Sequence, residues 1–345
     1  MDITTFIRKM PKIELHAHLN GSLCTQSIQE LCEQLYGVNS NEILLLSDKL
    51  INFDGVDLDK CFSKFPFMHE LTATKRGLQL ATELTIRDFA KDNVIYLELR
   101  TTPKKNAEMS KLEYVDSVLE AMERSEKTES TRVNLLLSID RSKSVADAEE
   151  TVNIALQLQD TYKGIISGID FSGNPKLGNF ADFIPVLEKA RQNNLKLSLH
   201  CAEIDNATEI DQMIKFGMER CGHGTFLSEL QLNEICRKNI AIECCLTSNV
   251  KCSTVRSYND HHFKHIFNAK KAPVILCTDD CGIFDTTLSN EFVLAKNTFN
   301  LKKTDLLQLS LNAVEFAFTY EYIKYDLKQR IRHYFETQSE PESKT

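Results

Sequence analysis

The chain has 345 residues, of which 42% are hydrophobic and 26% charged, as is usual for a globular protein with a sizeable core. Its formal net charge of −8 and the absence of a basic run argue against a nucleic-acid polymer as partner. No stretch of eighteen apolar residues predicts a membrane span, and residues 1–10 lack the apolar core of a signal peptide.

The cysteine pattern points to a reducing compartment. Four of the eleven cysteines lie inside apolar runs and are expected to be reduced and buried, namely Cys201, Cys244, Cys245 and Cys277. There is no Cys-x-x-Cys, so neither a zinc ribbon nor a thioredoxin-type pair is indicated. We therefore expect a cytosolic protein that does not engage a membrane.

Short apolar runs alternate with longer amphipathic segments along the chain. This alternation is typical of a parallel sheet covered by helices. The strands are predicted at Lys12–Leu19, Val94–Thr102, Val133–Asp140, Ile166–Ser172, Leu195–His200, Arg220–Gly224, Ile240–Leu246 and Pro273–Thr278.

Helices are predicted between these strands. Ser110 and Glu113 have capping-box spacing ahead of an apolar stripe, and a second stripe extends from Val145 to Leu156. Thr304 is predicted to cap a further helix that extends toward Phe318.

Eight strands with intervening helices predict an α/β fold, a single TIM (β/α)8 barrel over residues 1–338. Residues 25–74 are too many for one crossover helix and are expected to form a helical insertion near the active-site mouth. Residues 339–345 are polar and expected to be disordered. No linker or internal repeat suggests a second domain.

His16 and His18 lie one residue apart in the first predicted strand, so both point to the same side and can bind one ion. Three later strands also end in metal-binding types of side chain: His200 with Glu203, His223, and Asp279 with Asp280. Three imidazoles with one carboxylate suit zinc best. We predict one Zn²⁺ per chain, held by His16, His18, His200 and Asp279.

The remaining strand-end residues admit two interpretations each. His223 is one histidine more than the ligand set needs, and it either orients or deprotonates an attacking water or is a satisfied barrel histidine. Glu203 is either a proton donor to a substrate ring nitrogen or a surface carboxylate. Asp280 points away from Asp279 and is available to accept a hydrogen bond from substrate.

Several other catalytic signatures are missing. The chain has no His-x-Glu with Pro-Cys-x-x-Cys, the pattern of cytidine-type zinc deaminases. It also lacks His-Glu-x-x-His, Gly-x-Ser-x-Gly and Gly-x-x-x-x-Gly-Lys.

The chain resembles the adenosine/AMP deaminase family of zinc amidohydrolases in four segments. These are residues 11–21, the His200/Glu203 segment, residues 222–225 and residues 278–280. The resemblance implies the zinc ligands named above, with Glu203 as proton donor to the purine ring. It further implies that His223 assists the attacking hydroxide, that Asp280 binds substrate, and that the backbone of Gly173 contacts the purine.

Asn20 departs from the adenosine deaminase pattern, which usually has Asp there, on the 5′ side of the ribose. A neutral amide can donate a hydrogen bond to a phosphate that a carboxylate would repel. Residues 98–104 and 243–251 are similar to the N-6-methyl-AMP deaminase subgroup, as is His261-His262, to which we assign no ligand role. This similarity implies a nucleotide pocket of His18, Asn20, His69, Thr101, Thr102, Pro103, Lys104, Asp140, Gly173 and Asp280.

The expected activity is hydrolysis of a 6-amino or 6-alkylamino group on a purine 5′-monophosphate, above all N-6-methyl-AMP to IMP and methylamine. The resemblance also implies a monomer. Two alternatives stay open: an adenosine deaminase that acts on the free nucleoside, and a catalytically silent nucleoside-binding relative. Asn20 and Lys104 argue against the first, and the complete ligand set argues against the second.

Overall fold

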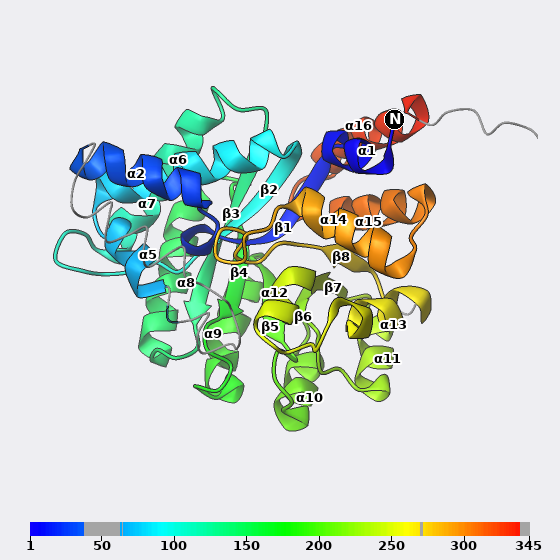
Figure 1. Ribbon diagram of the computed structural model, residues 1–345. Helices are drawn as coiled ribbons and strands as arrows, with labels where there is room; N and C mark the ends of the chain where they lie inside the picture. Colours follow the sequence, from blue (N-terminus) through cyan, green and yellow to red (C-terminus); the bar gives the residue numbers. More distant parts are fainter. Residues whose placement is uncertain (38–62, 64, 270–271, 339–345) are drawn as a thin grey trace, which may run out of the picture.

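The computed structural model describes residues 1–37, 63, 65–269 and 272–338 (Figure 1). The predicted disordered tail at 339–345 lies outside these residues. So does most of the predicted insertion at 25–74. No described helix is both long and apolar enough to cross a bilayer.

Eight parallel strands form one sheet in which each strand pairs with the next along the chain. They are β1 (Lys12–His18), β2 (Val94–Thr101), β3 (Arg132–Asp140), β4 (Ile166–Ser172), β5 (Lys196–Cys201), β6 (Arg220–His223), β7 (Ala241–Cys244) and β8 (Val274–Leu276). The segment after β8 returns to β1, where His18 N–H donates to the Asp279 carbonyl (3.0 Å) and Asp279 N–H to the His16 carbonyl (2.8 Å). The predicted (β/α)8 barrel is confirmed.

Helices connect the strands and surround the sheet (Figure 1). They are α1 (Ile3–Lys9), α2 (Thr25–Tyr36), α5 (Phe65–Leu71), α6 (Lys75–Lys91), α7 (Lys111–Ser125), α8 (Val145–Gln159), α9 (Phe180–Gln192), α10 (Ala207–Phe216), α11 (Glu229–Arg237), α12 (Leu246–Lys251), α13 (His262–Ala269), α14 (Leu288–Phe299), α15 (Lys303–Phe316) and α16 (Glu321–Thr337), with short 3-10 turns η1 (Leu19–Gly21) and η2 (Tyr258–Asp260).

The segment between β1 and β2 contributes α2 and α5, which pack with α6 through a separate apolar cluster that includes Leu31, Leu71 and Leu84. Helices α1 and α16 lie side by side (Figure 1), and the Tyr334 hydroxyl donates to the Phe6 carbonyl at 2.8 Å. This contact joins the two ends of the described chain.

Local sequence patterns account for some helix boundaries and not for others. Ser110 and Glu113 form the predicted capping box at α7. The prediction for Thr304 is wrong, because Lys302 is the N-cap of α15 and the helix begins at Lys303, two residues earlier than a cap at Thr304 implies. There the Asp305 carboxylate accepts the Lys302 N–H at 2.7 Å, so an acidic side chain inside the first turn stabilises this end. The helix ends at Phe316, short of Phe318.

The interior of the protein is mostly apolar and contains the cysteines that were predicted to be buried. Cys201, Cys244, Cys245 and Cys277 are all buried, and each of the ten described cysteines is a free thiol. The strands also carry fully buried charged residues, which lie beneath the site described next: Glu98, Arg100, Asp170, Arg220 and Glu243.

Candidate metal centre and adjoining pocket

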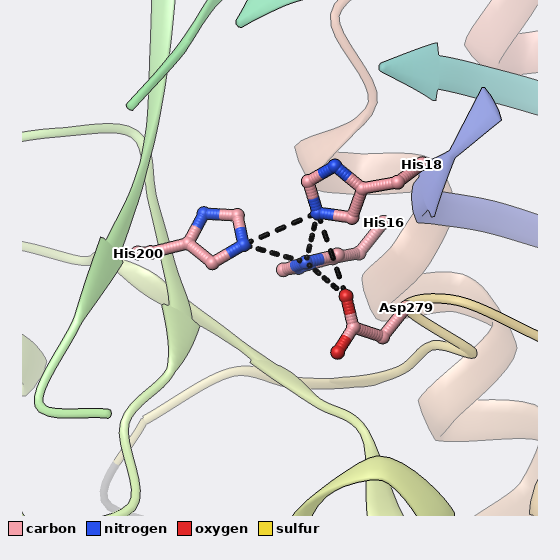
Figure 2. A group of neighbouring side chains, drawn as sticks. All are labelled: His16, His18, His200 and Asp279. Carbon is pink, nitrogen blue, oxygen red and sulfur yellow. Dashed lines mark hydrogen bonds and ion pairs between the residues drawn. The ribbon is translucent and has the colours of Figure 1, made fainter. Parts of the chain in front are cut away.

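Four side chains converge at the carboxyl ends of the strands (Figure 2). His16 and His18 project from β1, His200 from β5, and Asp279 from the segment after β8. Each offers one ligand atom, and these atoms all lie within 4.8 Å of one another. The three histidine Nε2 atoms are 3.2–3.3 Å apart, and Asp279 Oδ1 is 3.4 Å from Nε2 of His16 and of His18. This donor set and spacing fit one metal ion.

The surroundings shift the ligand pKa values in different directions. Burial and Arg100 oppose protonation of His16, but Glu243 and Asp279 raise its pKa above the usual value, so a bound metal ion would displace a proton there. Desolvation lowers the pKa of His18 to about 3, which leaves this imidazole neutral. Burial opposes ionisation of Asp279, but its contact with His16 and the neighbouring histidines hold the pKa of this carboxyl below its usual value. Neutral imidazoles and an ionised carboxylate are the forms that bind a cation.

Two buried carboxylates orient the histidine ligands. Glu243 Oε2 lies 2.7 Å from His16 Nδ1, and Asp170 Oδ1 lies 3.1 Å from His200 Nδ1. At His16, a proton on Nδ1 that is donated to Glu243 leaves the Nε2 lone pair free for the ion. Arg100 links both acids, at 2.9 Å from Asp170 and 2.6 Å from Glu243.

These three residues are not among the site residues that the sequence patterns predicted. The available signal was a charged side chain inside an otherwise apolar predicted strand, as Arg100 is in β2 and Glu243 in β7. Charged residues are almost never fully buried without partners, so each implied a buried counterpart. The sequence did not show which counterpart it was.

Glu203 and His223 adjoin the ligands. Glu203 follows β5 with its side chain 11% exposed, and burial raises its pKa to about 7. Its Oε1 lies 3.9 Å from Nε2 of His223, the buried last residue of β6. The ring centroid of His223 is 5.1 Å from those of His16 and His200. A carboxyl with a pKa near 7 is suited to donating a proton at neutral pH.

A cavity of about 290 Å³ opens onto these groups. It is lined by most of the predicted site residues, namely His18, Asn20, His69, Thr101, Thr102, Lys104, Asp140, Gly173, His200, Glu203, His223, Asp279 and Asp280. His16 and Pro103 do not line it. Phe65, Cys252 and Phe284 add an apolar lining that was not predicted from the sequence.

Two glycines allow close approach at the wall of this cavity. A Cβ on Gly21 would lie 1.7 Å from Asp280 Oδ1, so only glycine leaves room for that carboxylate. Gly173 has φ +95°, and a Cβ there would lie 2.4 Å from Asp140 Oδ1. The backbone around Gly173 is thereby held against the pocket.

Asn20 presents a donor to the cavity. The Tyr114 hydroxyl lies 3.4 Å from Asn20 Oδ1 and 2.7 Å from Thr101 Oγ1. Because the amide oxygen accepts from Tyr114, the amide nitrogen is left to donate elsewhere.

Lys104 and His69 form a close pair in the same cavity, with Lys104 Nζ against His69 Nε2. Burial and the nearby Lys104 charge lower the pKa of His69 to about 3, so the neutral imidazole accepts from the ammonium. Burial lowers the pKa of Lys104 to about 7, although Asp140 acts in the opposite direction. Lys104 is therefore only partly charged at neutral pH, and an anionic ligand in the cavity would stabilise its ammonium form.

Comparison with known proteins supplies a family. The adenosine deaminase profile matches residues 11–334. The chain is 50% identical over 331 residues to an adenosine deaminase-like protein of Drosophila pseudoobscura pseudoobscura, covering 95% of this chain and 97% of the relative. It is 36% identical over 340 residues to the N6-methyl-AMP deaminase of Homo sapiens, covering 96% and 95%. A solved ADAL–IMP complex superposes with a TM-score of 0.89 at 35% identity, covering 97% and 100%.

Proposed function

This chain belongs to the adenosine deaminase family, and on that premise we propose that it hydrolyses the 6-amino or 6-methylamino group of a purine nucleoside 5′-monophosphate, above all N6-methyl-AMP, to give IMP. One observation carries the choice of a nucleotide: the cavity that contains the metal-ligand cluster and Glu203 is also lined by the neutral Asn20 and by Lys104. The relative named N6-methyl-AMP deaminase and the ADAL structure with IMP support this choice.

We propose zinc as the ion. Ligands about 2.0–2.1 Å from a tetrahedral zinc are about 3.3 Å from one another. The ligand atoms of His16, His18, His200 and Asp279 are 3.2–3.4 Å apart where they are closest. When bound, zinc supplies a water nucleophile with a pKa of about 7.

The side chains have separate roles in the proposed reaction. Glu203 donates its proton to ring nitrogen N1, which makes carbon 6 electrophilic, while His223 orients the attacking water. Water adds to carbon 6 and the bond from carbon 6 to the exocyclic nitrogen breaks. Of the two protons of the water, one returns to Glu203 and the other passes to the departing amine, so that one water and one substrate give IMP and methylamine, or ammonia from AMP. Asp280 and the backbone of Gly173 hold the purine.

A panel of three substrates tests the proposal. Deamination of N6-methyl-AMP, AMP and adenosine is followed by ultraviolet absorbance, with metal content measured on the same preparation. We expect the nucleotides to have the higher kcat/KM and the protein to hold one zinc per chain. A preference for adenosine would indicate the free nucleoside instead. Bound metal without turnover of any purine would indicate a silent relative.

We propose that the protein acts as a monomer in the cytosol. The free, mostly buried thiols are consistent with a reducing compartment. Sedimentation velocity and cell fractionation test the two statements separately.

Replacing Asn20 with aspartate is expected to lower kcat/KM for AMP at least about tenfold, or about 1.4 kcal/mol, while adenosine is turned over as before or better. The added carboxylate would repel a phosphate and cannot donate to it. Asn20→Ser, which keeps a neutral donor, serves as the matched control. An unchanged ratio of AMP to adenosine turnover in Asn20→Asp would remove Asn20 from phosphate recognition.

Because of Lys104, we expect kcat/KM to depend on pH differently for a nucleotide substrate and for a nucleoside substrate. With a pKa of about 7, Lys104 loses its charge as the pH rises above that value, whereas a phosphate is doubly ionised only above a pH of about 6. We therefore expect kcat/KM for AMP to be greatest between about pH 6 and 7. Above pH 7, loss of the Lys104 charge should add up to about tenfold per pH unit to the fall that deprotonation of Glu203, also with a pKa of about 7, causes for either substrate. In the complex with AMP, the bound phosphate raises the pKa of Lys104. The fall in kcat that Lys104 causes should therefore begin at a higher pH than the fall in kcat/KM.

The matched variant is Lys104→Arg, whose guanidinium stays charged with a pKa above about 12. It is expected to make the alkaline fall for AMP as shallow as that for adenosine, which comes from deprotonation of Glu203 alone. If adenosine shows the same fall as AMP in the unaltered protein, the titrating group belongs to the reaction centre instead.

A further inference from the structure

Behind the cavity, a buried asparagine separates two buried histidines. Asn249, in α12, lies between His223 and His261, the residue that follows η2, and all three are 2% exposed. We propose that His261 and Asn249 form a hydrogen-bond chain that fixes His223 as the tautomer with its proton on Nε2. His223 then meets the attacking water as a hydrogen-bond donor. The attacking water belongs to the function proposed above, whereas the tautomer of His223 is independent of that function.

The chain begins at a backbone amide. The Phe263 N–H donates to His261 Nδ1 at 3.1 Å. A backbone N–H can only donate, so Nδ1 must carry a lone pair. Burial and the neighbouring histidines lower the pKa of His261 to about 2, which leaves a neutral ring. Its one proton therefore lies on Nε2.

The second link fixes the orientation of the Asn249 amide. His261 Nε2 lies 3.2 Å from Asn249 Oδ1 and donates to it. The amide nitrogen consequently faces the other way, toward Thr225 Oγ1 and Thr254 Oγ1, both at 3.3 Å, and His223 Nδ1 at 3.4 Å. A reversed amide would direct its NH₂ group at the His261 N–H, and two donors cannot bond.

The third link sets the tautomer of His223. Within the described part of the chain, Asn249 Nδ2 is the one hydrogen-bond partner of His223 Nδ1, and it is a donor. A proton on His223 Nδ1 would face that NH₂ group, so the proton lies on Nε2 instead. Nε2 is the ring nitrogen that approaches Glu203, at 3.9 Å. Because Nδ1 accepts a hydrogen bond, the ring carries a single proton and is neutral.

His262 secures the backbone of the same residue. Its Nε2 donates to the His223 carbonyl at 2.8 Å, and its ring stacks on that of His261 with centroids 4.2 Å apart. The carbonyl needs such a hold because His223 has φ +63°, a left-handed conformation that costs energy for a residue other than glycine. The histidine pair after β7, which has no ligand role, is thus assigned to positioning His223.

This assignment separates two roles for His223. A neutral ring with its proton on Nε2 has no lone pair there, so it cannot take a proton from a water on that side. It can donate to the oxygen and direct a lone pair of the water toward carbon 6. We therefore assign His223 to orienting the water and His261 and Asn249 to positioning His223.

The tautomer can be measured directly. Long-range ¹H–¹⁵N correlation spectra of the metal-loaded protein with ¹⁵N-histidine show which ring nitrogen lacks a proton. The His223 signals are assigned by their loss in His223→Gln. We expect Nδ1 to be the unprotonated nitrogen of His223 and of His261. An unprotonated Nε2 on His223 would overturn the proposal, whatever the protein's activity.

Two variants test the links. In Asn249→Asp, a carboxylate accepts from both sides, so the His223 proton should move to Nδ1 and kcat should fall by about 10- to 100-fold. His261→Gln keeps a side-chain donor and acceptor and should retain the native His223 tautomer, whereas His261→Phe should not. His265→Gln, at a half-exposed position of α13, is the matched control. A native tautomer in both Asn249→Asp and His261→Phe would contradict the chain.

Discussion

Glu203→Gln is expected to lower kcat by about 10²–10⁴-fold, the usual contribution of a positioned general acid. Glutamine keeps the shape of the side chain but has no proton of suitable acidity to give to ring nitrogen N1. The effect should be confined to turnover, since Glu203 is not among the four ligand atoms that converge at the strand ends. Steady-state rates with N6-methyl-AMP and metal analysis of the same sample measure the two properties.

Two comparisons make the Glu203 result specific. Glu234→Gln, which alters a half-exposed carboxylate paired with Arg237 in α11, should leave kcat unchanged. Binding of IMP to Glu203→Gln should be nearly retained, because binding of the product requires no proton transfer from residue 203. Full turnover by Glu203→Gln would refute the role of proton donor, and loss of metal would mean that the side chain helps to hold the ion.

The sequence was sufficient for the barrel and for the cluster of ligands because both follow from periodicity. In a parallel barrel all strand ends lie on one rim, so His16, His200 and Asp279 could be brought together without knowledge of any contact. The predicted strand boundaries were less accurate. The strand predicted to reach Leu246 ends at Cys244, because the chain turns into α12 directly after it.

Contacts between distant strands could not be predicted in this way. Arg100 reaches across the barrel to Glu243, 143 residues away, and only the closed sheet brings them within 2.6 Å. The chain from His261 to His223 was hidden for a similar reason. His261-His262 was noticed as a motif, but its role depends on where α12 places Asn249.

Beneath the proposed metal ligands, Arg100 belongs to a network that contains two guanidinium groups and three carboxylates. Arg100 pairs with Asp170 and Glu243, while Arg220 pairs with Glu98 and also with Glu243. All five side chains are fully buried. Arg100 also donates to the Leu15 carbonyl at 2.7 Å, next to the ligand His16.

Arg100→Met is therefore expected to lower the free energy of unfolding by about 3–5 kcal/mol, because it leaves buried carboxylates without their counter-charge. The same change should weaken metal binding by about 10- to 100-fold, since Asp170 and Glu243 would no longer be held against His200 and His16. Urea unfolding of the metal-free protein measures the first effect, and competition with a chelating dye measures the second.

Arg124→Met is the matched control for Arg100→Met, because Arg124 pairs with Glu83 in a salt bridge that is 46% and 32% exposed. Its expected cost is below about 1 kcal/mol. If both arginine variants unfold at the same urea concentration, the buried network does not stabilise the fold. If Arg100→Met is less stable but binds metal as tightly as before, the two carboxylates orient the histidines without Arg100. Only a loss of both properties would show that one guanidinium supports the barrel and the metal centre together.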